Sequence, residues 1–194
     1  MENKYVIILA DPPWAYARTW DKDPKNGGIT YPTLTMEDLK SLPIASIASK
    51  DCALFLWATF PKLPECIATM EAWGFRYITV AFTWLKLNPK GKGIYSGMGS
   101  WTNSNQEIVL FGKRGHPKRM AKNVKQVIEA PRGRHSAKPK EAHDRILQLL
   151  GPLKAIELFA RDRHPHFDTV GNEISGKDIR VELQEIIDGN WVQS

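Results

Sequence analysis

Four consecutive residues, Asp11-Pro12-Pro13-Trp14, bring together a carboxylate, two prolines and an indole. The two prolines remove two backbone N–H groups and fix φ twice, so this segment cannot continue a strand or a helix. Its carbonyl groups are therefore expected to point outward, beside the carboxylate. Such groups suit a flat ring that carries an amino group, because the carboxylate and a carbonyl accept hydrogen bonds and the indole can stack.

The element that positions this segment is the apolar run directly before it, residues 5–10. A run of this length and composition predicts a buried strand. The four residues then lie at the carboxyl end of that strand. In open α/β sheets this is where ligands bind and chemistry takes place.

Further along the chain, apolar runs alternate with helical patterns. Strands are expected at residues 53–58, 77–85, 107–111, 127–128, 155–159 and 167–170. Helices are expected from Thr35 to about Pro43, with a capping box to Asp38, and at residues 61–74, 138–150 and 178–188. Ser136 is a candidate cap for the third of these helices. The pattern predicts an α/β fold, formed by one domain over residues 1–194, with a mostly parallel sheet, helices on both faces and one antiparallel hairpin late in the sheet.

The composition fits a globular protein of one domain: 194 residues, 42% hydrophobic and 25% charged. The longest apolar runs have about six residues, far below the roughly 20 that span a membrane. The amino terminus lacks the layout of a signal peptide. Two cysteines outside any metal-binding pattern are expected to be reduced thiols. We therefore expect a cytoplasmic protein without membrane contact. The Gly-x-Gly-x-x-Gly fingerprint is absent, which argues against a nicotinamide or flavin dehydrogenase.

The net charge of +6 is unevenly distributed. Residues 113–140 contain ten basic side chains and one acidic one, whereas the remainder of the chain has 17 basic and 20 acidic residues. A local excess of +9 in a chain that is otherwise acidic predicts contact with a polyanion, and nucleic acid fits best. Four of these residues are taken as phosphate contacts: Lys113, Arg114, Lys118 and Arg119.

The motif at Asp11 resembles that of amino-methyltransferases, which methylate exocyclic amines of bases. With its tryptophan, the chain resembles the adenine-N6 methyltransferase family whose best-known member is the catalytic subunit of the eukaryotic messenger-RNA methyltransferase. It looks like a small bacterial or phage member with the permuted, β-type order of motifs. The resemblance covers nearly the whole chain and is carried by residues 54–59, 83–86, 105–107, 135–139, 156–161 and 171–173.

The resemblance implies a Rossmann-like fold and S-adenosyl-L-methionine as the cofactor. Asp11, Pro12, Pro13 and Trp14 would then be catalytic, with the carboxylate and the Pro12 carbonyl accepting from the adenine amine and the indole stacking on the ring. The residues implied in cofactor binding are Asp11, Lys138, Glu157, Phe159, Arg161, Asn172 and Glu173. Lys138 as a phosphate contact and Asn172 as a turn residue stay open.

The chain departs from the family at several positions. Ala160 replaces the usual glycine and Glu173 the usual glutamine, and residues 162–164 differ from the family's Pro-His-Asn. His164 and His166 lack further ligands at fitting spacing, so no metal is expected.

The acceptor nucleotide is expected to contact Asn103 and Glu107, which match acceptor positions of the family. Trp101 and Tyr16 are candidates for stacking on a base, and each could instead anchor its loop. Both belong to long, glycine-rich connections, residues 16–31 and 86–104, that are expected to determine which adenine is chosen.

DNA is the preferred substrate, because the compact chain has no zinc fingers or added RNA-binding modules. RNA is the alternative within the class. A non-catalytic nucleic-acid-binding subunit, and methylation of cytosine N4 or of a protein glutamine, are alternatives outside it. Relatives often pair with a second methyltransferase-like chain, so a homodimer or such a pair is also expected.

Overall fold

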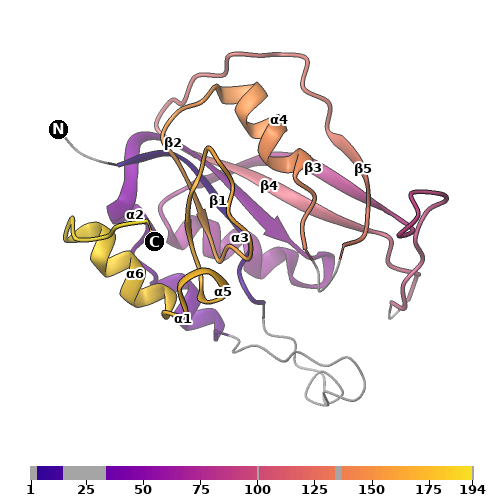
Figure 1. Ribbon diagram of the computed structural model, residues 1–194, viewed down its shortest axis with the longest axis horizontal. Coiled ribbons are helices and arrows are strands. Elements are labelled where there is room, and N and C mark those ends of the chain that lie inside the picture. Colours follow the sequence, from indigo (N-terminus) through magenta and orange to yellow (C-terminus); the bar gives the residue numbers. More distant parts are fainter. Residues whose placement is uncertain (1–3, 15–33, 100, 134–136, 194) are drawn as a thin grey trace.

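The computed structural model describes residues 4–14, 34–99, 101–133 and 137–193 (Figure 1). One seven-stranded sheet contains strands from both ends of the sequence, in the order β5-β3-β4-β2-β1-β6-β7. The strands are β1 (Tyr5–Ala10), β2 (Ala48–Ala58), β3 (Arg76–Leu87), β4 (Gln106–Arg114), β5 (Val127–Pro131), β6 (Ala155–Leu158) and β7 (Asp168–Val170).

All neighbouring strands are parallel except for β4, which is antiparallel to both β2 and β3. The α/β fold with a mostly parallel sheet is therefore confirmed. The antiparallel hairpin is β3–β4, and it lies in the middle of the chain rather than late in it.

Helices cover both faces of the sheet (Figure 1). They are α1 (Met36–Ser41), α2 (Ile44–Ile47), the short η3 (Phe60–Lys62), α3 (Leu63–Ala72), α4 (Glu141–Leu150), α5 (Asn172–Ser175) and α6 (Ile179–Ile187). The alternation of side chains along β1 shows the division: Ile8 packs with α1, α2, α3 and α6, whereas Ile7 and Leu9 pack with α4.

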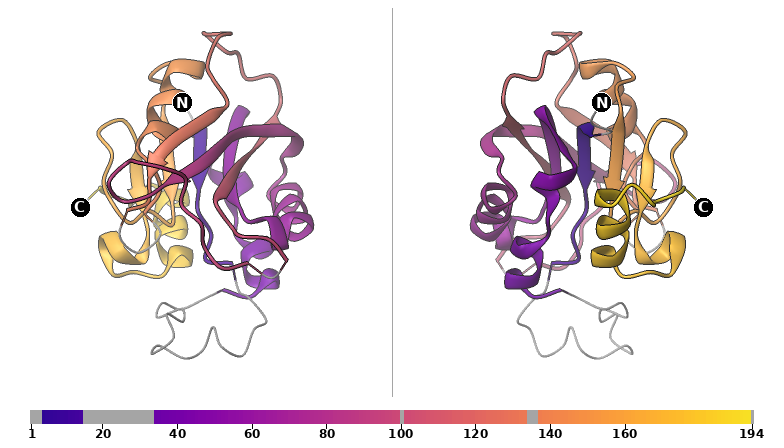
Figure 2. Two further views of the ribbon diagram at one scale, coloured as in Figure 1. Left: turned by 90° about the vertical axis from the view of Figure 1, so that its right-hand side faces the viewer. Right: turned by 90° about the vertical axis from the view of Figure 1, so that its left-hand side faces the viewer.

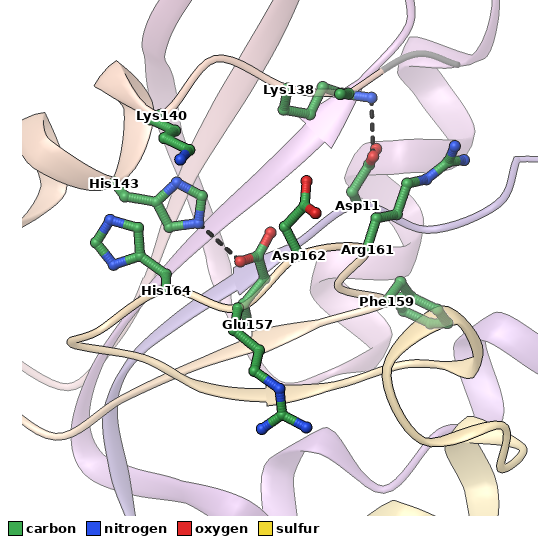
Figure 3. Close-up of a pocket in the computed structure, with 11 residues that line it drawn as sticks. Asp11, Lys138, Lys140, His143, Glu157, Phe159, Arg161, Asp162 and His164 are labelled. Atoms are coloured by element: carbon green, nitrogen blue, oxygen red, sulfur yellow. Dashed lines mark hydrogen bonds and ion pairs between the residues drawn. The ribbon is translucent and has the colours of Figure 1, made fainter. Parts of the chain in front are cut away.

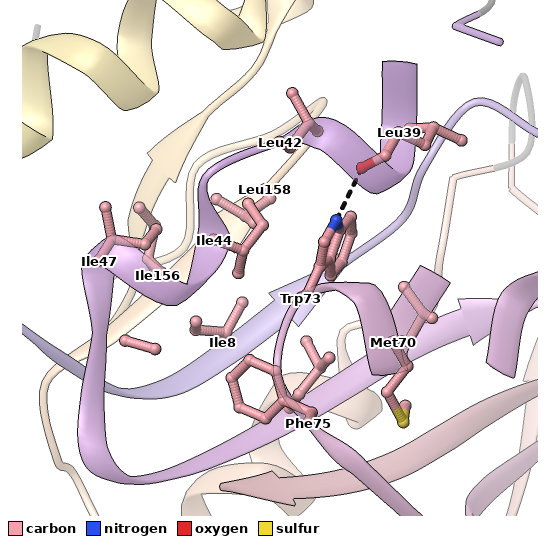
Figure 4. Packing of buried hydrophobic residues seen from close by; sticks show 14 of the residues in the cluster. Ile8, Leu39, Leu42, Ile44, Ile47, Met70, Trp73, Phe75, Ile156 and Leu158 are labelled. Atoms are coloured by element: carbon pink, nitrogen blue, oxygen red, sulfur yellow. Dashed lines mark hydrogen bonds between the residues drawn. The ribbon is translucent and has the colours of Figure 1, made fainter. Parts of the chain in front are cut away.

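The larger core lies between the sheet and α1, α2, α3 and α6 (Figure 4). Trp73 is fully buried at its centre, and its indole Nε1 donates to the carbonyl of Leu39 at 2.7 Å. The indole therefore packs as an apolar group while its one polar atom is satisfied. This contact fixes α1 against the end of α3.

Several element boundaries differ from expectation, and two of the differences have a clear physical reason. The helix expected from Lys138 begins at Glu141, because Pro139 restricts Lys138 to extended backbone. The strand expected at residues 107–111 continues to Arg114 through Gly112. A Cβ atom at Gly112 would lie 2.4 Å from Sδ of Met70, so the glycine allows α3 to pack on the strand. The predicted capping box of Thr35 and Asp38 is present, and Ser136 lies outside the described residues.

The two ends of the sheet differ in which strands begin and finish there. The catalytic end is where β1 finishes at Ala10 and β4 begins at Gln106, and the far end is where β1 begins at Tyr5 and β4 finishes at Arg114. In Figure 2 the catalytic end points down and the far end points up.

Candidate active site

Strand β1 delivers Asp11 to the catalytic end of the sheet. The strand pairs with β2 on one side and β6 on the other, and its residues 7–10 are fully buried. The backbone N–H of Asp11 still donates to the carbonyl of Leu158 at 3.3 Å, whereas the prolines that follow cannot continue the ladder. Asp11 is thus the last residue held by the sheet, and its position is fixed by two neighbouring strands.

Trp14 turns into the protein rather than outward. Its side chain is 5% exposed, and its indole Nε1 donates to the carbonyl of Trp57 at 3.0 Å. The backbone N–H of Trp14 also donates to the Pro12 carbonyl at 2.8 Å, which leaves that carbonyl one further lone pair. In this arrangement the indole anchors the catalytic loop to the end of β2 and does not offer an open face for stacking. The stacking role expected for Trp14 is not supported by this packing.

Four charged side chains form a chain of alternating sign beside the loop. Lys86 contacts Glu107 at 2.5 Å, Glu107 contacts Lys138 at 3.3 Å, and Lys138 contacts Asp11 at 2.8 Å. All four side chains are between 13% and 17% exposed, so water screens these contacts only weakly. The ammonium of Lys138 also lies 5.3 Å from the centre of the Trp57 ring. The set joins residues that are up to 127 positions apart in sequence.

The pKa values of these groups reflect burial and pairing together. Burial raises the pKa of Asp11, and the ammonium of Lys138 offsets only part of the rise. Burial alone would lower the pKa of Lys138, but the carboxylates of Asp11 and Glu107 raise it above the ordinary lysine value. Burial would raise the pKa of Glu107, and the two lysines lower it instead. Lys138 and Glu107 are therefore charged at neutral pH, while Asp11 is the member most readily protonated.

A pocket of about 160 Å³ opens beside Asp11, between α4 and the loop after β6 (Figure 3). Its wall carries both signs of charge. The lining residues are Asp11, Ala137, Lys138, Lys140, His143, Glu157, Phe159, Arg161, Asp162, Arg163 and His164.

The loops at the pocket have unusual backbone geometry. Phe159, directly after β6, has a φ of 62°, which is rare for an aromatic residue and costs of order 1–3 kcal/mol. A Cβ atom at Gly171 would lie 2.5 Å from the carbonyl oxygen of Ala160, so only glycine lets the loops after β6 and β7 approach this closely. Strain and close approach of this kind concentrate at functional sites.

Two histidines line the pocket beside Glu157. His143 Nε2 lies 2.7 Å from the Glu157 carboxylate, and the ring of His164 stacks on that of His143 at 4.4 Å. Burial and the neighbouring His143 lower the pKa of His164. The Nδ1 atoms of both rings are buried and have no hydrogen-bond partner among the described residues. Buried polar atoms normally have partners, so these atoms indicate that a polar group of a ligand enters here.

The structure brings together most of the residues expected to bind the cofactor. Lys138, Glu157, Phe159 and Arg161 line the pocket with Asp11. Asn172 and Glu173 lie outside the pocket lining, at the start of α5. Glu173 is connected to the pocket through Arg161, whose Nε lies 3.4 Å from its carboxylate.

The residues expected to bind the acceptor nucleotide are dispersed. Glu107 belongs to the charged chain that includes Asp11. Trp101 and Asn103 lie in the connection between β3 and β4 at the catalytic end, and both are exposed. Tyr16 lies outside the described residues.

The four basic residues expected to hold phosphates lie elsewhere. Lys113 and Arg114 are at the far end of β4, about 20 Å along the strand from Glu107. Lys118 and Arg119 follow them in the connection from β4 to β5, a segment whose ribbon reaches the top of Figure 2. A nucleotide at Asp11 cannot reach these side chains directly, and their contact with phosphates elsewhere on a nucleic acid stays a prediction. The sequence reveals the charge, but the direction of β4 determines where it lies.

Several site residues were not expected from the sequence. Lys86, which contacts Glu107, belongs to residues 83–86, a segment that carries the family resemblance. Its place in that segment is the signal from which a role in the site could have been predicted. His143 gave no signal because it belongs to no motif, and Lys140 was counted only as one cation of the basic segment, residues 113–140. The described residues contain no group of three side chains that could hold a metal ion. Within the same ranges, no helix has the length and apolarity to cross a membrane.

The fold and the site define a class. A mostly parallel sheet, a Pro-rich acidic loop after a central strand and a pocket of mixed charge at that strand end are the arrangement of a Rossmann-like methyltransferase. The model of the MT-A70 family matches residues 5–173 of the chain. The chain therefore belongs to the MT-A70 family, as the adenine-N6 methyltransferase motifs predicted.

Individual relatives include a type II methyltransferase and enzymes named for N6 methylation of adenine or adenosine. The chain is 37% identical to the type II methyltransferase M.MunI of Mycoplasma sp, over 97% of this chain and 85% of that protein. It is 25% identical to the N6-methyladenosine RNA methyltransferase MTA1 of Cryphonectria parasitica, over 88% of this chain and 52% of that one. It is 23% identical to the N(6)-adenine-specific methyltransferase METTL4 of Mus musculus, over 88% of this chain and 37% of that protein.

Proposed function

We propose that this protein transfers a methyl group from S-adenosyl-L-methionine to the N6 amine of adenine in DNA. The observation that carries the proposal is Asp11, a buried carboxylate at the end of the central strand that faces the pocket and is held by Lys138 at 2.8 Å. An amine acceptor needs such a group beside the methyl donor. Membership of the MT-A70 family and the relative named as an N(6)-adenine-specific methyltransferase support the reaction. DNA is proposed because the type II methyltransferase M.MunI is 37% identical, whereas the relative MTA1, named for RNA, is 25% identical.

The pocket suits S-adenosyl-L-methionine because that molecule carries a carboxylate, an ammonium, a sulfonium and ribose hydroxyls. When bound, it supplies an electrophilic methyl group. Lys138 and Lys140 would pair with its carboxylate, and Glu157 and the orphaned imidazole nitrogens would meet its polar groups. Arg161, Asn172 and Glu173 would contact the ribose and adenine, and Phe159 would pack on them.

Asp11 and the Pro12 carbonyl would hold the acceptor. The lone pair of the adenine amine is delocalised into the ring, which makes it a poor nucleophile. Two acceptors on its N–H groups localise the lone pair on nitrogen and direct it toward the methyl group. As the nitrogen–carbon bond forms, the bond between the methyl carbon and sulfur would break, with S-adenosyl-L-homocysteine as the leaving group. The amine becomes cationic, the ionised Asp11 stabilises that charge, and the proton that the amine then loses passes to solvent. Lys86 and Lys138 balance the negative charges of Glu107 and Asp11, so these four side chains together carry no net charge.

The alternatives differ in the polymer or in the presence of catalysis. RNA is the second candidate, because the relative MTA1 is named as an RNA methyltransferase. A non-catalytic nucleic-acid-binding subunit is disfavoured, because the Asp11-Pro12-Pro13-Trp14 motif is complete and its carboxylate, Asp11, lines the pocket. Formation of a homodimer, or of a pair with a methyltransferase-like subunit, stays a prediction.

The test is methyl transfer by the purified protein, with tritiated S-adenosyl-L-methionine, matched DNA and RNA pools and nucleoside analysis of the products. We expect N6-methyladenine in DNA. Asp11→Asn should lower the transfer rate at least about 100-fold, since an amide lacks the negative charge that stabilises the cationic amine. Its DNA affinity should stay within a few-fold of the parent's.

The control is Asp188→Asn, an exposed carboxylate at the end of α6, which should leave the transfer rate unchanged. Equal transfer rates for Asp11→Asn and the parent would refute the mechanism. If the protein methylates adenosine in the RNA pool and not in the DNA pool, the substrate is RNA rather than DNA.

A further inference from the structure

The connection between β3 and β4 contains a tight turn that exposes large apolar side chains. Gly97 and Ser104 form an antiparallel bridge with two backbone hydrogen bonds of 2.9 Å. Within the turn, a Cβ atom at Gly99 would lie 2.0 Å from the carbonyl oxygen of Thr102, so the turn depends on glycine at that position. Its shape is therefore set by the backbone.

Trp101 and Met98 project from this turn into solvent. Their side chains are 98% and 96% exposed, whereas Trp57 and Trp84 in the core are each 1% exposed. Burial of a tryptophan side chain contributes a large favourable free energy, and a tryptophan whose full surface stays in water does not gain it. Such exposure on a constrained turn indicates that a partner covers the ring.

The charge around the turn indicates the chemistry of that partner. Residues 86–106 contain Lys86, Lys90 and Lys92 and no acidic residue. The guanidinium of Arg132 stacks 4.4 Å above the ring of Tyr95 and donates to its hydroxyl, which places a further cation beside the turn. An isolated apolar ring among cations and small polar side chains fits nucleic acid, where phosphates and base faces lie side by side.

The turn is also on the correct side of the protein. The same connection leads directly into β4, whose second residue, Glu107, contacts Lys138 and through it Asp11. The backbone N–H of Lys86 donates to the carbonyl of Asn105 at 2.9 Å, which holds the base of the connection at the catalytic end. Nucleic acid that offers a base to Asp11 would therefore pass this turn.

We propose that Trp101 is a wedge that enters the base stack of duplex DNA at the gap left by the target adenine, with Lys90, Lys92 and Arg132 on the flanking phosphates. The inference rests on the proposed function, because a base inside a duplex must leave the stack to be methylated. The indole occupies the gap and slows the return of the adenine. Trp101 is then a positioning residue for duplex substrates, and a base in a single strand does not require it.

The experiment compares Trp101→Ala with the parent on one oligonucleotide sequence that the parent is first shown to methylate. The sequence is supplied as a single strand, as a matched duplex and as a duplex with a mismatch at the target adenine. We expect a loss of about ten- to one hundredfold on the matched duplex, the range found when one base–aromatic stack is removed. The loss should be smaller on the mismatch and within about twofold on the single strand, because less or no unstacking is needed there.

A second readout is direct. With 2-aminopurine at the target position of the duplex, the parent should increase its fluorescence on binding, and Trp101→Ala should give less of this increase. For Trp101→Phe, the methylation rate on the matched duplex and the fluorescence increase should both lie between those of Trp101→Ala and the parent. The matched control is Met120→Ala, which removes a 74% exposed apolar side chain at the far end and should change neither.

The outcomes separate the two proposals. If the parent methylates none of the substrates, the proposed function fails. If the parent is active and Trp101→Ala keeps full duplex activity, the wedge is refuted. An equal loss on all three substrates would also refute it, since Trp101 would then stack on bases irrespective of strand pairing.

Discussion

Lys138 holds two carboxylates that the proposed reaction uses differently. Asp11 accepts from the adenine amine, while Glu107 is paired on its other side by Lys86. The sequence motifs indicated these residues one by one, as members of separate segments. Their contacts could not be predicted, because the 127 positions between Asp11 and Lys138 carry no information about distance. The inward packing of Trp14 was equally hidden, since it depends on the carbonyl of Trp57.

Replacement of Lys138 by methionine should move the acidic limb of the pH–rate profile to higher pH. Asp11 works in its ionised form, and burial already raises its pKa. Without the neighbouring ammonium the pKa rises further, so a higher pH is needed to ionise the carboxylate. The measurement is kcat against pH at saturating donor and DNA.

The comparison for this variant is Lys86→Met. It removes a cation that contacts Glu107 rather than Asp11, so the limb should move less. A limb in Lys138→Met that stays at the parental pH would show that the cation does not control Asp11.

At the scale of elements, hydrophobic patterns predicted the strands well, because buried strands are short continuous apolar runs between turn residues. The strand before Asp11 has the predicted bounds. The sequence was less informative where a glycine served packing, as at Gly112 in β4, or where one glycine allows two loops to meet. Gly171 was expected only as part of a family segment, and its contact with Ala160 became visible in the fold.

Gly171→Ala should weaken the binding of S-adenosyl-L-methionine at least several-fold. The added methyl group would overlap the carbonyl of Ala160 and force the loops after β6 and β7 apart, at a cost of about 1–3 kcal/mol in the free energy of unfolding. Isothermal titration with the donor and thermal unfolding measure the two effects.

Gly176→Ala is the matched control for Gly171→Ala. Gly176 has a φ of 74° but no atom within 4 Å of an added Cβ, so alanine there introduces backbone strain without moving the two loops. Donor affinity should then be retained. If Gly171→Ala binds the donor as tightly as the parent, the close approach of the loops has no part in cofactor binding.

For the whole molecule, the distribution of charge over the two ends of the sheet decides how DNA can be held. Net charge and its clustering at residues 113–140 were readable from the sequence. The sequence did not show at which end of the sheet each basic residue lies, because that follows from the antiparallel direction of β4. Lys90, Lys92 and Arg132 accompany the catalytic end, and Lys118 and Arg119 lie toward the far end.

A double change of Lys90 and Lys92 to alanine should weaken binding to a short duplex centred on the target adenine. Each lost phosphate contact should also reduce the slope of log K against log salt concentration by about 0.9. The same change at Lys118 and Arg119 should leave the affinity and the slope for this duplex unaffected. Fluorescence anisotropy over a salt series measures both. If the change at Lys118 and Arg119 lowers the affinity and the slope while the change at Lys90 and Lys92 does not, DNA contacts the far end instead.

The place of β1 in the middle of the sheet has a consequence for how the protein is made. The Asp11 loop directly follows β1, yet β6, one of the two neighbours of β1, begins only at Ala155. Until then one side of a fully apolar strand has no partner, and unpaired strands of this kind promote aggregation. The donor pocket and the lysine that holds Asp11 also belong to the last third of the chain. Synthesis therefore produces the reactive carboxylate early and completes its surroundings last.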